Sequence, residues 1–336
     1  MERLEDVVIV GAGPIGLACA ISARRRALDP LVIDQGSICH SIVRYPIGMT
    51  FFTTPERLEI GGHPFACSGQ KPTREEALMY YRGVVRAEGL RVRTYTRLVT
   101  ASRMEEHIAC GIETRLGSEK IWCRRLILAT GYYDNPNPIG VEGEDQPHVS
   151  HYFDEAHRSC GQRVVVIGAK NSAVEAALEL YRAGAHVTLI SRHTAFRPTV
   201  KYWLVPDIRN RIAAGEIDAR FGVEVVRIGR TGVTVRGADG ESEEIPCDRV
   251  YALTGFRPDF ELFEEIGITL DPESRAPAID AASLETNVPG VFMAGSITHG
   301  RRISEVFIEN GRFDGEKIFA DVVNPPLTAY SIKLSS

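Results

Sequence analysis

Residues 7–36, VVIVGAGPIGLACAISARRRALDPLVIDQG, and residues 164–193, VVVIGAKNSAVEAALELYRAGAHVTLISRH, establish the architecture of this 336-residue chain. They align at an offset of 157 residues (164 − 7 = 157), and each predicts a strand, a tight turn, a helix and a second strand. That order, with glycine at the turn, is typical of the unit that binds a dinucleotide. The sequence therefore predicts two dinucleotide sites in one chain.

The first copy carries the complete glycine fingerprint, Gly11-Ala12-Gly13-Pro14-Ile15-Gly16. Its first glycine permits the tight turn, its second lets the backbone approach a pyrophosphate, and its third allows close packing of helix on strand. The free N–H groups and the dipole of the helix start favour the diphosphate. Asp34 ends the second strand, 23 residues after Gly11 (34 − 11 = 23), where a ribose-binding acid belongs. The expected contacts are Gly11, Gly13, Pro14, Ile15, Gly16, Asp34 and Gln35.

The second copy keeps the turn but changes the fingerprint. Gly168 retains the first glycine, and Ala173 replaces the third, which the pattern tolerates. Lys170 stands at the middle position, where its side chain either crowds the phosphates or places a cation beside them. We favour the cation because the unit is otherwise intact. The expected contacts of this turn are Gly168, Lys170, Asn171, Ser172 and Ala173.

The end of the second strand distinguishes the two nucleotides. The position that matches Asp34 holds Ser191, followed by Arg192, and Arg197 lies slightly downstream. An acid there would repel a ribose 2′-phosphate, whereas a hydroxyl and a guanidinium can bind it by charge-assisted hydrogen bonds. The sequence therefore favours NADPH over NADH, with a solvated charge at a strand end as the alternative interpretation of Arg192.

Three later segments support a pairing of FAD with NADPH. Residues 126–132 (LILATGY) and 250–256 (VYALTGF) each predict a buried strand that ends in Thr-Gly, where glycine lets the backbone lie close to a cofactor. Residues 286–296 (TNVPGVFMAGS) predict a turn, an apolar strand and another glycine. The added contacts are Ala129, Thr130, Gly131, Gly295 and Ser296 for FAD, and Thr254 and Gly255 for NADPH.

These segments give the chain a family resemblance over nearly its whole length. It resembles flavoproteins of the thioredoxin reductase type, and more narrowly the bacillithiol disulfide reductase family. The narrower resemblance rests on short segments in the same order along the chain: Tyr45-Pro46, Thr50-Phe51-Phe52, Lys71-Pro72, Tyr80-Tyr81-Arg82, ATGYY (129–133), Lys170-Asn171-Ser172-Ala173 and FIENG (307–311). It implies FAD, NADPH, an oligomeric assembly and no C-x-x-C motif.

Two departures from the family concern chemistry. The family typically carries a cysteine immediately before the last fingerprint glycine, and this chain has Ile15 there. In the thioredoxin reductase type, a late Ala-Gly-Asp segment contacts the flavin side of FAD; here it reads Ala294-Gly295-Ser296 and lacks the acid. Cys19 lies one helical turn after Ile15 and is a weak candidate for a displaced nucleophile, with a small buried core residue as the alternative. We name no other catalytic residue.

The resemblance implies an enzyme that passes hydride from NADPH to flavin and then to an acceptor, with a low-molecular-weight disulfide as the leading expectation. Because Ile15 replaces the cysteine, a ferredoxin- or flavodoxin-type reductase, a flavin-linked oxidase and a redox-sensing binding protein stay open as alternatives. Residues 304–322 predict a helix with Ser304 as N-cap, whose start would support negative charge on the flavin.

The chain order predicts two Rossmann-like, three-layer α/β domains, one inserted in the other. The Gly295 segment must return to the FAD, so the FAD domain is discontinuous and spans residues 1–157 and 257–336. The NADPH domain spans residues 158–256.

Composition excludes several other classes of protein. With 39 Lys and Arg against 44 Asp and Glu, the net charge of −5 gives no drive toward nucleic acid or an anionic membrane. No apolar run reaches membrane-spanning length, and the N-terminus shows no signal peptide, so we expect a cytoplasmic protein. The seven cysteines are scattered, so we expect no disulfide framework. We interpret His151, His157, His193 and His299 as surface residues without metal-ligand spacing, and we expect no metal. The expected partners are a small disulfide or redox protein and further copies of this chain.

Overall fold

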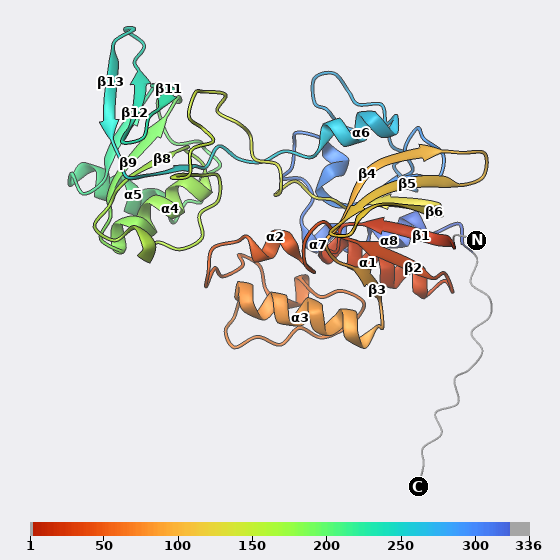
Figure 1. The fold of residues 1–336 in the computed structure, drawn as a ribbon. Coiled ribbons are helices and arrows are strands. Elements are labelled where there is room, and N and C mark those ends of the chain that lie inside the picture. The colour runs from red at the N-terminus through yellow and green to blue at the C-terminus, as the bar shows by residue number, and fades with distance from the viewer. Residues whose placement is uncertain (1–2, 323–336) are drawn as a thin grey trace. The chain divides into compact units, whose positions relative to one another are not determined.

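The computed structural model describes residues 3–322 and divides them into two compact units (Figure 1). The first unit contains the residues up to Val43, Gly48–Asn135, and those from Arg257 onward. The second unit contains Arg44–Ile47 and Pro136–Phe256. Residues 323–336, the end of the predicted FAD domain, lie outside the described residues. One unit is thus inserted in the chain of the other.

The first unit is built on a seven-stranded sheet of order β3-β2-β1-β6-β5-β4, with β15 also paired to β6. Strands β1, β2, β3, β6 and β15 run parallel, and β4, β5 and β6 form an antiparallel meander. The strands are β1 (Leu4–Val10), β2 (Pro30–Ile33), β3 (Arg91–Arg93), β4 (Thr96–Arg103), β5 (Ile108–Thr114), β6 (Gly117–Leu128) and β15 (Val291–Met293).

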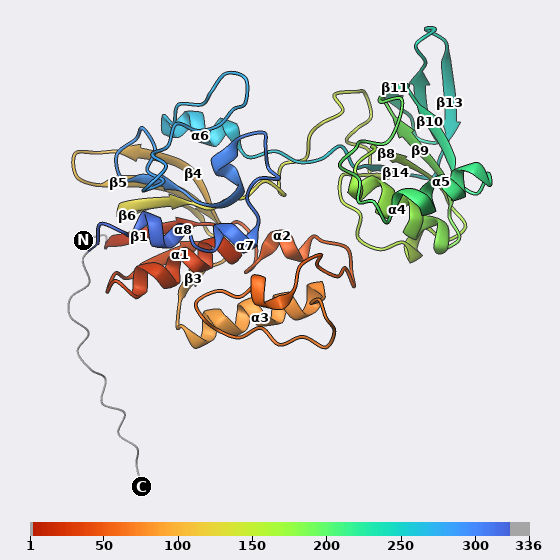
Figure 2. The same ribbon diagram turned by 180° about the vertical axis from the view of Figure 1, so that it is seen from behind.

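Helices lie on both faces of this sheet (Figures 1 and 2). Alternation along β1 explains why: Val8 and Val10 pack with the apolar face of α6, while Val7 and Ile9 are buried on the other side, where α1 lies. The helices are α1 (Pro14–Arg24), α2 (His40–Val43), α3 (Arg74–Ala87), α6 (Phe260–Ile266), α7 (Ile308–Gly311) and α8 (Asp314–Ile318), with 3-10 turns η1 (Pro55–Arg57) and η3 (Gly295–His299).

The second unit has three layers around a parallel sheet of order β10-β9-β8-β14-β7. Helices α4 and α5 pack on one face, and an antiparallel sheet of order β11-β12-β13 covers the other. The elements are β7 (Val149–Ser150), η2 (His157–Ser159), β8 (Arg163–Ile167), α4 (Asn171–Arg182), β9 (His186–Ser191), α5 (Val205–Ala213), β10 (Asp218–Phe221), β11 (Glu224–Ile228), β12 (Gly232–Arg236), β13 (Ser242–Pro246) and β14 (Arg249–Ala252).

Both predicted strand–turn–helix–strand units are present, as β1-α1-β2 and β8-α4-β9. The compact units divide at Asn135/Pro136, whereas the sequence analysis placed the first boundary at 157/158. The difference arises because β7, inside residues 136–157, pairs with β14 of the second unit. Strand pairing outside the repeated motif is a long-range contact that the local pattern does not reveal.

The predicted helix over residues 304–322 is wrong. The chain instead forms two short helices, α7 and α8, and Ser304 lies in a turn before α7 rather than at an N-cap. Arg312, which follows α7, donates to the carbonyl oxygens of Glu56 (2.8 Å) and Glu59 (2.7 Å). These long-range hydrogen bonds fix the break between the helices, and they override the local preference for one long helix.

Candidate functional site

The first fingerprint turn leaves no room for side chains at two of its glycines. Gly11 has φ +114°, and a Cβ placed on it would lie 2.3 Å from the carbonyl oxygen of Ala129. A Cβ on Gly16 would lie 1.9 Å from the carbonyl oxygen of Gly11. Both glycines are therefore required for close packing of strand ends and helix, as the fingerprint predicts.

Gly13, which lies between these two glycines, has open space beside it. A Cβ on Gly13 would meet no atom within 4 Å, so the turn opens onto free space at that point. Gly13 is also the N-cap of α1, and no side chain caps that helix, whereas Thr73 and Glu76 form a full capping box on α3. The start of α1 thus keeps open backbone N–H donors of the kind that bind a diphosphate.

Asp34 lies at the end of β2, beside this turn. Its Oδ2 accepts from the backbone N–H of Ala12 and its Oδ1 from that of Gly36, both at 2.7 Å. Burial raises the pKa of the Asp34 carboxyl, and the hydrogen bonds from Gly36 and Ala12 oppose that rise. The neighbouring Gln35 donates to Asp134 at 3.0 Å. The structure therefore ties the predicted ribose acid directly to the fingerprint.

The Ala129-Thr130-Gly131 segment joins the same edge of the sheet. The N–H of Ala129 donates to the carbonyl oxygen of Val10 at 2.8 Å, and Gly131 adopts a left-handed φ of +67°. The hydroxyl oxygen of Thr130 is buried and has no hydrogen-bond partner among the described residues. Since a buried polar group without a partner is costly, this hydroxyl is the kind of group that a bound cofactor satisfies.

The segment around Gly295 packs against the start of α1. Gly295, with φ +81°, donates its N–H to Asp314 Oδ2 at 2.8 Å, and a Cβ on it would lie 2.9 Å from Cδ1 of Ile15. A Cβ on Gly311 would lie 2.6 Å from the same atom. Ile15 therefore packs its side chain against both glycines at the start of α1. Ser296, the residue in place of the family's acid, is buried in η3.

The first unit thus fits FAD: an open helix start, an acid at the end of β2 and an unpartnered buried hydroxyl surround one sheet edge. Ser304 does not share the helix-start role predicted for it. Asp314 is a site residue that sequence reasoning missed, because nothing local marks a carboxylate 19 residues after Gly295 (314 − 295 = 19) as its partner. Burial raises the pKa of the Asp314 carboxyl, and the Gly295 hydrogen bond opposes that rise.

The second fingerprint repeats this geometry in the second unit. Gly168 has φ +145°, and a Cβ on it would lie 2.6 Å from the carbonyl oxygen of Leu253 and 3.0 Å from Cβ of Ala173. Thr254 donates its hydroxyl to the carbonyl oxygen of Asn137 at 2.6 Å, while the N–H of Asn137 donates to Gly255 at 2.9 Å. The segment with Thr254 and Gly255 thus meets the Gly168 turn as the segment with Thr130 meets Gly11.

Three cations lie at the start of α4 or on the segment that follows β9. Lys170, Arg192 and Arg197 are exposed, and none forms an ion pair with another residue of the described range. Lys170 is the N-cap of α4, and no side chain caps this helix. Ser191 is buried at the end of β9, where its hydroxyl accepts from the N–H of His193 at 3.0 Å. This arrangement fits the phosphates of NADPH.

Asn171 and Ser172, the other predicted contacts of this turn, behave differently. The side chain of Asn171 accepts from the N–H of Lys201 (2.8 Å) and donates to the carbonyl oxygen of Thr199 (3.2 Å). It therefore anchors a loop. Ser172 is exposed on α4.

The cysteines offer little redox chemistry. Cys19 is fully buried in α1, and its burial and the nearby Asp314 raise the pKa of its thiol far above the ordinary value. This argues against Cys19 as a nucleophile, because the thiolate is the reactive form. Burial also raises the pKa of the Cys39 thiol. Cys110, Cys123 and Cys247 are buried as well, which leaves only Cys67 and Cys160 reachable from solvent.

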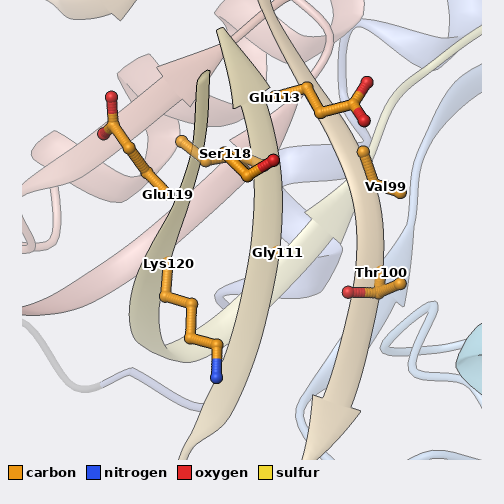
Figure 3. A pocket seen from close by; sticks show the side chains of 8 residues that line it. Val99, Thr100, Gly111, Glu113, Ser118, Glu119 and Lys120 are labelled. Carbon is orange, nitrogen blue, oxygen red and sulfur yellow. The ribbon is translucent and has the colours of Figure 1, made fainter. Parts of the chain in front are cut away.

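The described residues contain no group of three His, Cys, Asp or Glu side chains that could hold a metal ion. None of their helices is long and apolar enough to cross a membrane. A hollow of about 750 Å³ lies on the β4–β5–β6 meander, lined by Thr100, Glu113, Ser118, Glu119 and Lys120 among others (Figure 3). None of the predicted cofactor residues lines it.

Comparisons with known proteins identify the family of this chain. A family model described as pyridine nucleotide-disulphide oxidoreductase matches residues 8–295. The chain is 42% identical over 318 residues to bacilliredoxin reductase Bdr of Bacillus subtilis (strain 168), which covers 95% of this chain and 97% of that protein.

Solved structures show the same relation. The structure of bacillithiol disulfide reductase from Bacillus cereus matches with a TM-score of 0.92 and 40% identity, over 95% of this chain and 99% of that one. Thioredoxin reductase from T. acidophilum matches with a TM-score of 0.74 and 22% identity, over 96% and 98%, which shows the fold alone.

Proposed function

Because the chain belongs to the pyridine nucleotide-disulphide oxidoreductase family, we propose that it reduces a low-molecular-weight disulfide at the expense of NADPH. It is an NAD(P)H-dependent flavoprotein oxidoreductase with a thioredoxin reductase-like fold, and its cofactors are FAD and NADPH. Bacillithiol disulfide is the first candidate acceptor, since the relative from B. cereus is named as a bacillithiol disulfide reductase. The overall reaction is NADPH + H⁺ + RSSR → NADP⁺ + 2 RSH.

When bound, FAD supplies the redox chemistry, accepting a hydride from NADPH and passing two electrons on. The chain's own contribution in the first unit is to bind and orient. The open N–H donors at Gly13 hold the diphosphate, and Asp34 accepts from the ribose. The buried hydroxyl of Thr130 has no hydrogen-bond partner among the described residues, so it is available to the cofactor. Pro14, Ile15, Gln35 and Ser296 are the further FAD contacts of the proposal.

In the second unit the chain selects the nucleotide by charge. Lys170 and the start of α4 bind the diphosphate of NADPH, and Arg192 and Arg197 bind its 2′-phosphate with Ser191 beside them. The segment with Thr254 and Gly255 borders the turn. The assignment of these residues and the resulting preference for NADPH over NADH are part of the proposal.

No protein thiol takes part in the proposed reaction. The family's cysteine is Ile15 here, whose side chain packs against Gly295 and Gly311. The five buried cysteines are shielded from an acceptor. Of the two reachable ones, Cys67 donates to the carbonyl oxygen of Gly69 at 3.0 Å, and Cys160 belongs to the second unit. The acceptor therefore takes its electrons without a mixed disulfide to this chain. A homo-oligomer and a cytoplasmic location stay predictions.

The structural observation that supports the two cofactors is the pair of uncapped helix starts, each flanked by groups that suit its own nucleotide. The disulfide acceptor rests on the relatives. The test is anaerobic NADPH oxidation by the FAD-loaded protein against bacillithiol disulfide, other low-mass disulfides, ferredoxin, quinone and free flavin. We expect the highest kcat/KM with a low-mass disulfide. Turnover with ferredoxin or quinone alone would contradict the disulfide proposal and favour the alternatives.

A further inference from the structure

A loop of the second unit contacts the predicted nucleotide turn. We define residues 192–204 as the β9–α5 loop. At Arg197 it donates a backbone N–H to the carbonyl oxygen of Ala169 at 3.3 Å. At Thr199 and Lys201 it binds the Asn171 side chain described above. The loop therefore contacts the Gly168–Asn171 turn on both sides of Lys170.

Further contacts hold this loop in place. Phe196 meets Phe221 edge-to-face at 5.1 Å between ring centroids, and Val200 is buried in the core of the unit. The ammonium of Lys201 pairs with Glu175 of α4 at 2.7 Å. The loop is thus anchored to a strand, to the core and to the helix that starts at the turn.

Directly after the anchored part, the loop exposes two large aromatic residues. Tyr202 is 82% exposed and Trp203 is 53% exposed. Their rings meet at 88° with centroids 5.0 Å apart, and Lys201 Nζ lies 5.7 Å from the centroid of Trp203. Two perpendicular rings form a corner in which a flat ring can stack on one face and touch the other with its edge.

The position of this corner and the charges near it indicate which flat ring would bind there. In a β-α-β dinucleotide unit the end of the second strand meets the ribose that carries the 2′ group, so the loop that follows flanks the adenosine half. Arg192 and Arg197, which form no ion pair with another described residue, lie on this same loop and complement the phosphate of that half. Every base has a face that stacks on aromatic side chains.

We propose that Tyr202 and Trp203 form the adenine-binding corner for NADPH. The inference rests on the proposed function, because it takes NADPH as the nucleotide. It adds two positioning residues that hold the adenosine half while Lys170, Arg192 and Arg197 bind its phosphates.

Fluorescence tests the contact apart from turnover. The chain has two tryptophans, so Trp122→Phe leaves Trp203 as the sole tryptophan reporter. Adding 2′,5′-ADP, which carries only the adenosine half, should quench Trp203 emission to saturation, whereas nicotinamide mononucleotide should leave it unchanged. No change with 2′,5′-ADP, or a change with the mononucleotide alone, overturns the inference. Bleaching of flavin by NADPH in the same sample shows separately whether the proposed function holds.

Affinity gives a second readout. The double variant Tyr202→Leu/Trp203→Leu should raise the Kd for 2′,5′-ADP roughly tenfold by calorimetry, a loss typical of base-stacking aromatics. Tyr95→Leu, at a 46% exposed tyrosine of the first unit, is the matched control and should leave the Kd unchanged. An unchanged Kd in the double variant contradicts the proposal. If its sedimentation also shows a smaller assembly, the corner is an interface between copies instead.

Discussion

Gly13 and Gly16 lie three positions apart in one turn, but an added side chain would meet open space at one and backbone at the other. Gly16 is bounded by backbone at 1.9 Å from an added Cβ, and Gly13 opens onto free space. Gly16 is required for folding, whereas Gly13 leaves room for a ligand. Substitution of each by alanine therefore separates packing from cofactor binding.

Gly13→Ala should leave the apoprotein's stability within about 0.5 kcal/mol of the parent, because the added methyl group meets no protein atom and the φ of −74° suits alanine. FAD affinity should fall roughly tenfold or more, because the methyl group occupies the approach of the diphosphate to the helix start. Thermal unfolding of the apoprotein and a flavin-fluorescence titration measure the two effects.

Gly16→Ala is the matched comparison. Its methyl group collides with the backbone of Gly11, so we expect a loss of about 3 kcal/mol or more in stability. If Gly13→Ala destabilises the apoprotein as much as Gly16→Ala, or if it binds FAD as tightly as the parent, the assignment of the diphosphate site to this turn is wrong.

Arg192 tests the choice of nucleotide. Arg192→Ala should raise the KM for NADPH roughly 10- to 100-fold, since a hydrogen bond between charged groups contributes about 1.5–3 kcal/mol. The KM for NADH should stay within twofold, because NADH lacks the 2′-phosphate. Steady-state kinetics with both nucleotides decides this, and equal losses with both would show that Arg192 does not contact that phosphate.

At the residue scale, the sequence identifies glycines and charges better than their partners. Gly11, Gly16 and Gly168 have the tight surroundings that the fingerprint predicts. The hydrogen bond between Gly295 and Asp314 was not predictable, because it joins two segments through the tertiary fold. The same holds for Asn171, whose side chain anchors the β9–α5 loop as well as lying at the nucleotide turn.

At the scale of elements, local pattern identifies the two repeated units well. The apolar run before Gly11 is strand β1, and the helix predicted after the turn is α1, which ends at Arg24. The helix predicted over 304–322 fails because Arg312 forms tertiary hydrogen bonds to Glu56 and Glu59. Helical periodicity cannot register such contacts.

Pairing between β8 and β14 gives a prediction about pH. Arg163 donates to Asp248 from its side chain and its backbone N–H, and the side-chain bond is the larger cause that lowers the pKa of Asp248 to about 2, from 3.8. A lowered carboxyl pKa means that its contribution to stability is complete above the unfolded value of 3.8 and is lost as the pH falls toward 2.

Asp248→Asn should therefore lower the urea midpoint at neutral pH, and the difference from the parent should shrink between the two pKa values and vanish below them as the pH falls. Asp218→Asn is the control, because its exposed carboxylate has no ion pair within the described range. Urea titrations over this pH range give the measurement. A difference that persists in acid would mean that Asp248 stabilises the pair through something other than its charge.

At the scale of the whole molecule, the repeat at an offset of 157 residues predicts one domain inserted in another. The structure has one compact unit inserted in the chain of the other, and the assignment of FAD and NADPH to these units stays a prediction. The boundary itself was not predictable from the repeat, because β7 joins the second unit through pairing with β14. The family resemblance is confirmed by the comparisons, while the individual cofactor contacts stay predictions.

The cysteines give the molecule-scale prediction about chemistry. Since only Cys67 and Cys160 are reachable, Cys67→Ser/Cys160→Ser should leave disulfide turnover within about twofold of the parent, because no thiol relay is lost. Steady-state assays with a low-mass disulfide measure this. Ile15→Cys is the informative companion, since it restores a thiol beside Gly295. A loss of turnover in the double serine variant would show that the chain does use a thiol.

The most direct test of the account is an anaerobic titration of the FAD-loaded protein with NADPH, followed by the absorption of oxidised flavin. We predict a yellow protein that one equivalent of NADPH per FAD bleaches completely, since FAD alone stores electrons in this chain. A protein that binds no FAD, or a flavin that NADPH does not reduce, would contradict the account. A requirement for two equivalents would contradict its claim that no cysteine pair takes part.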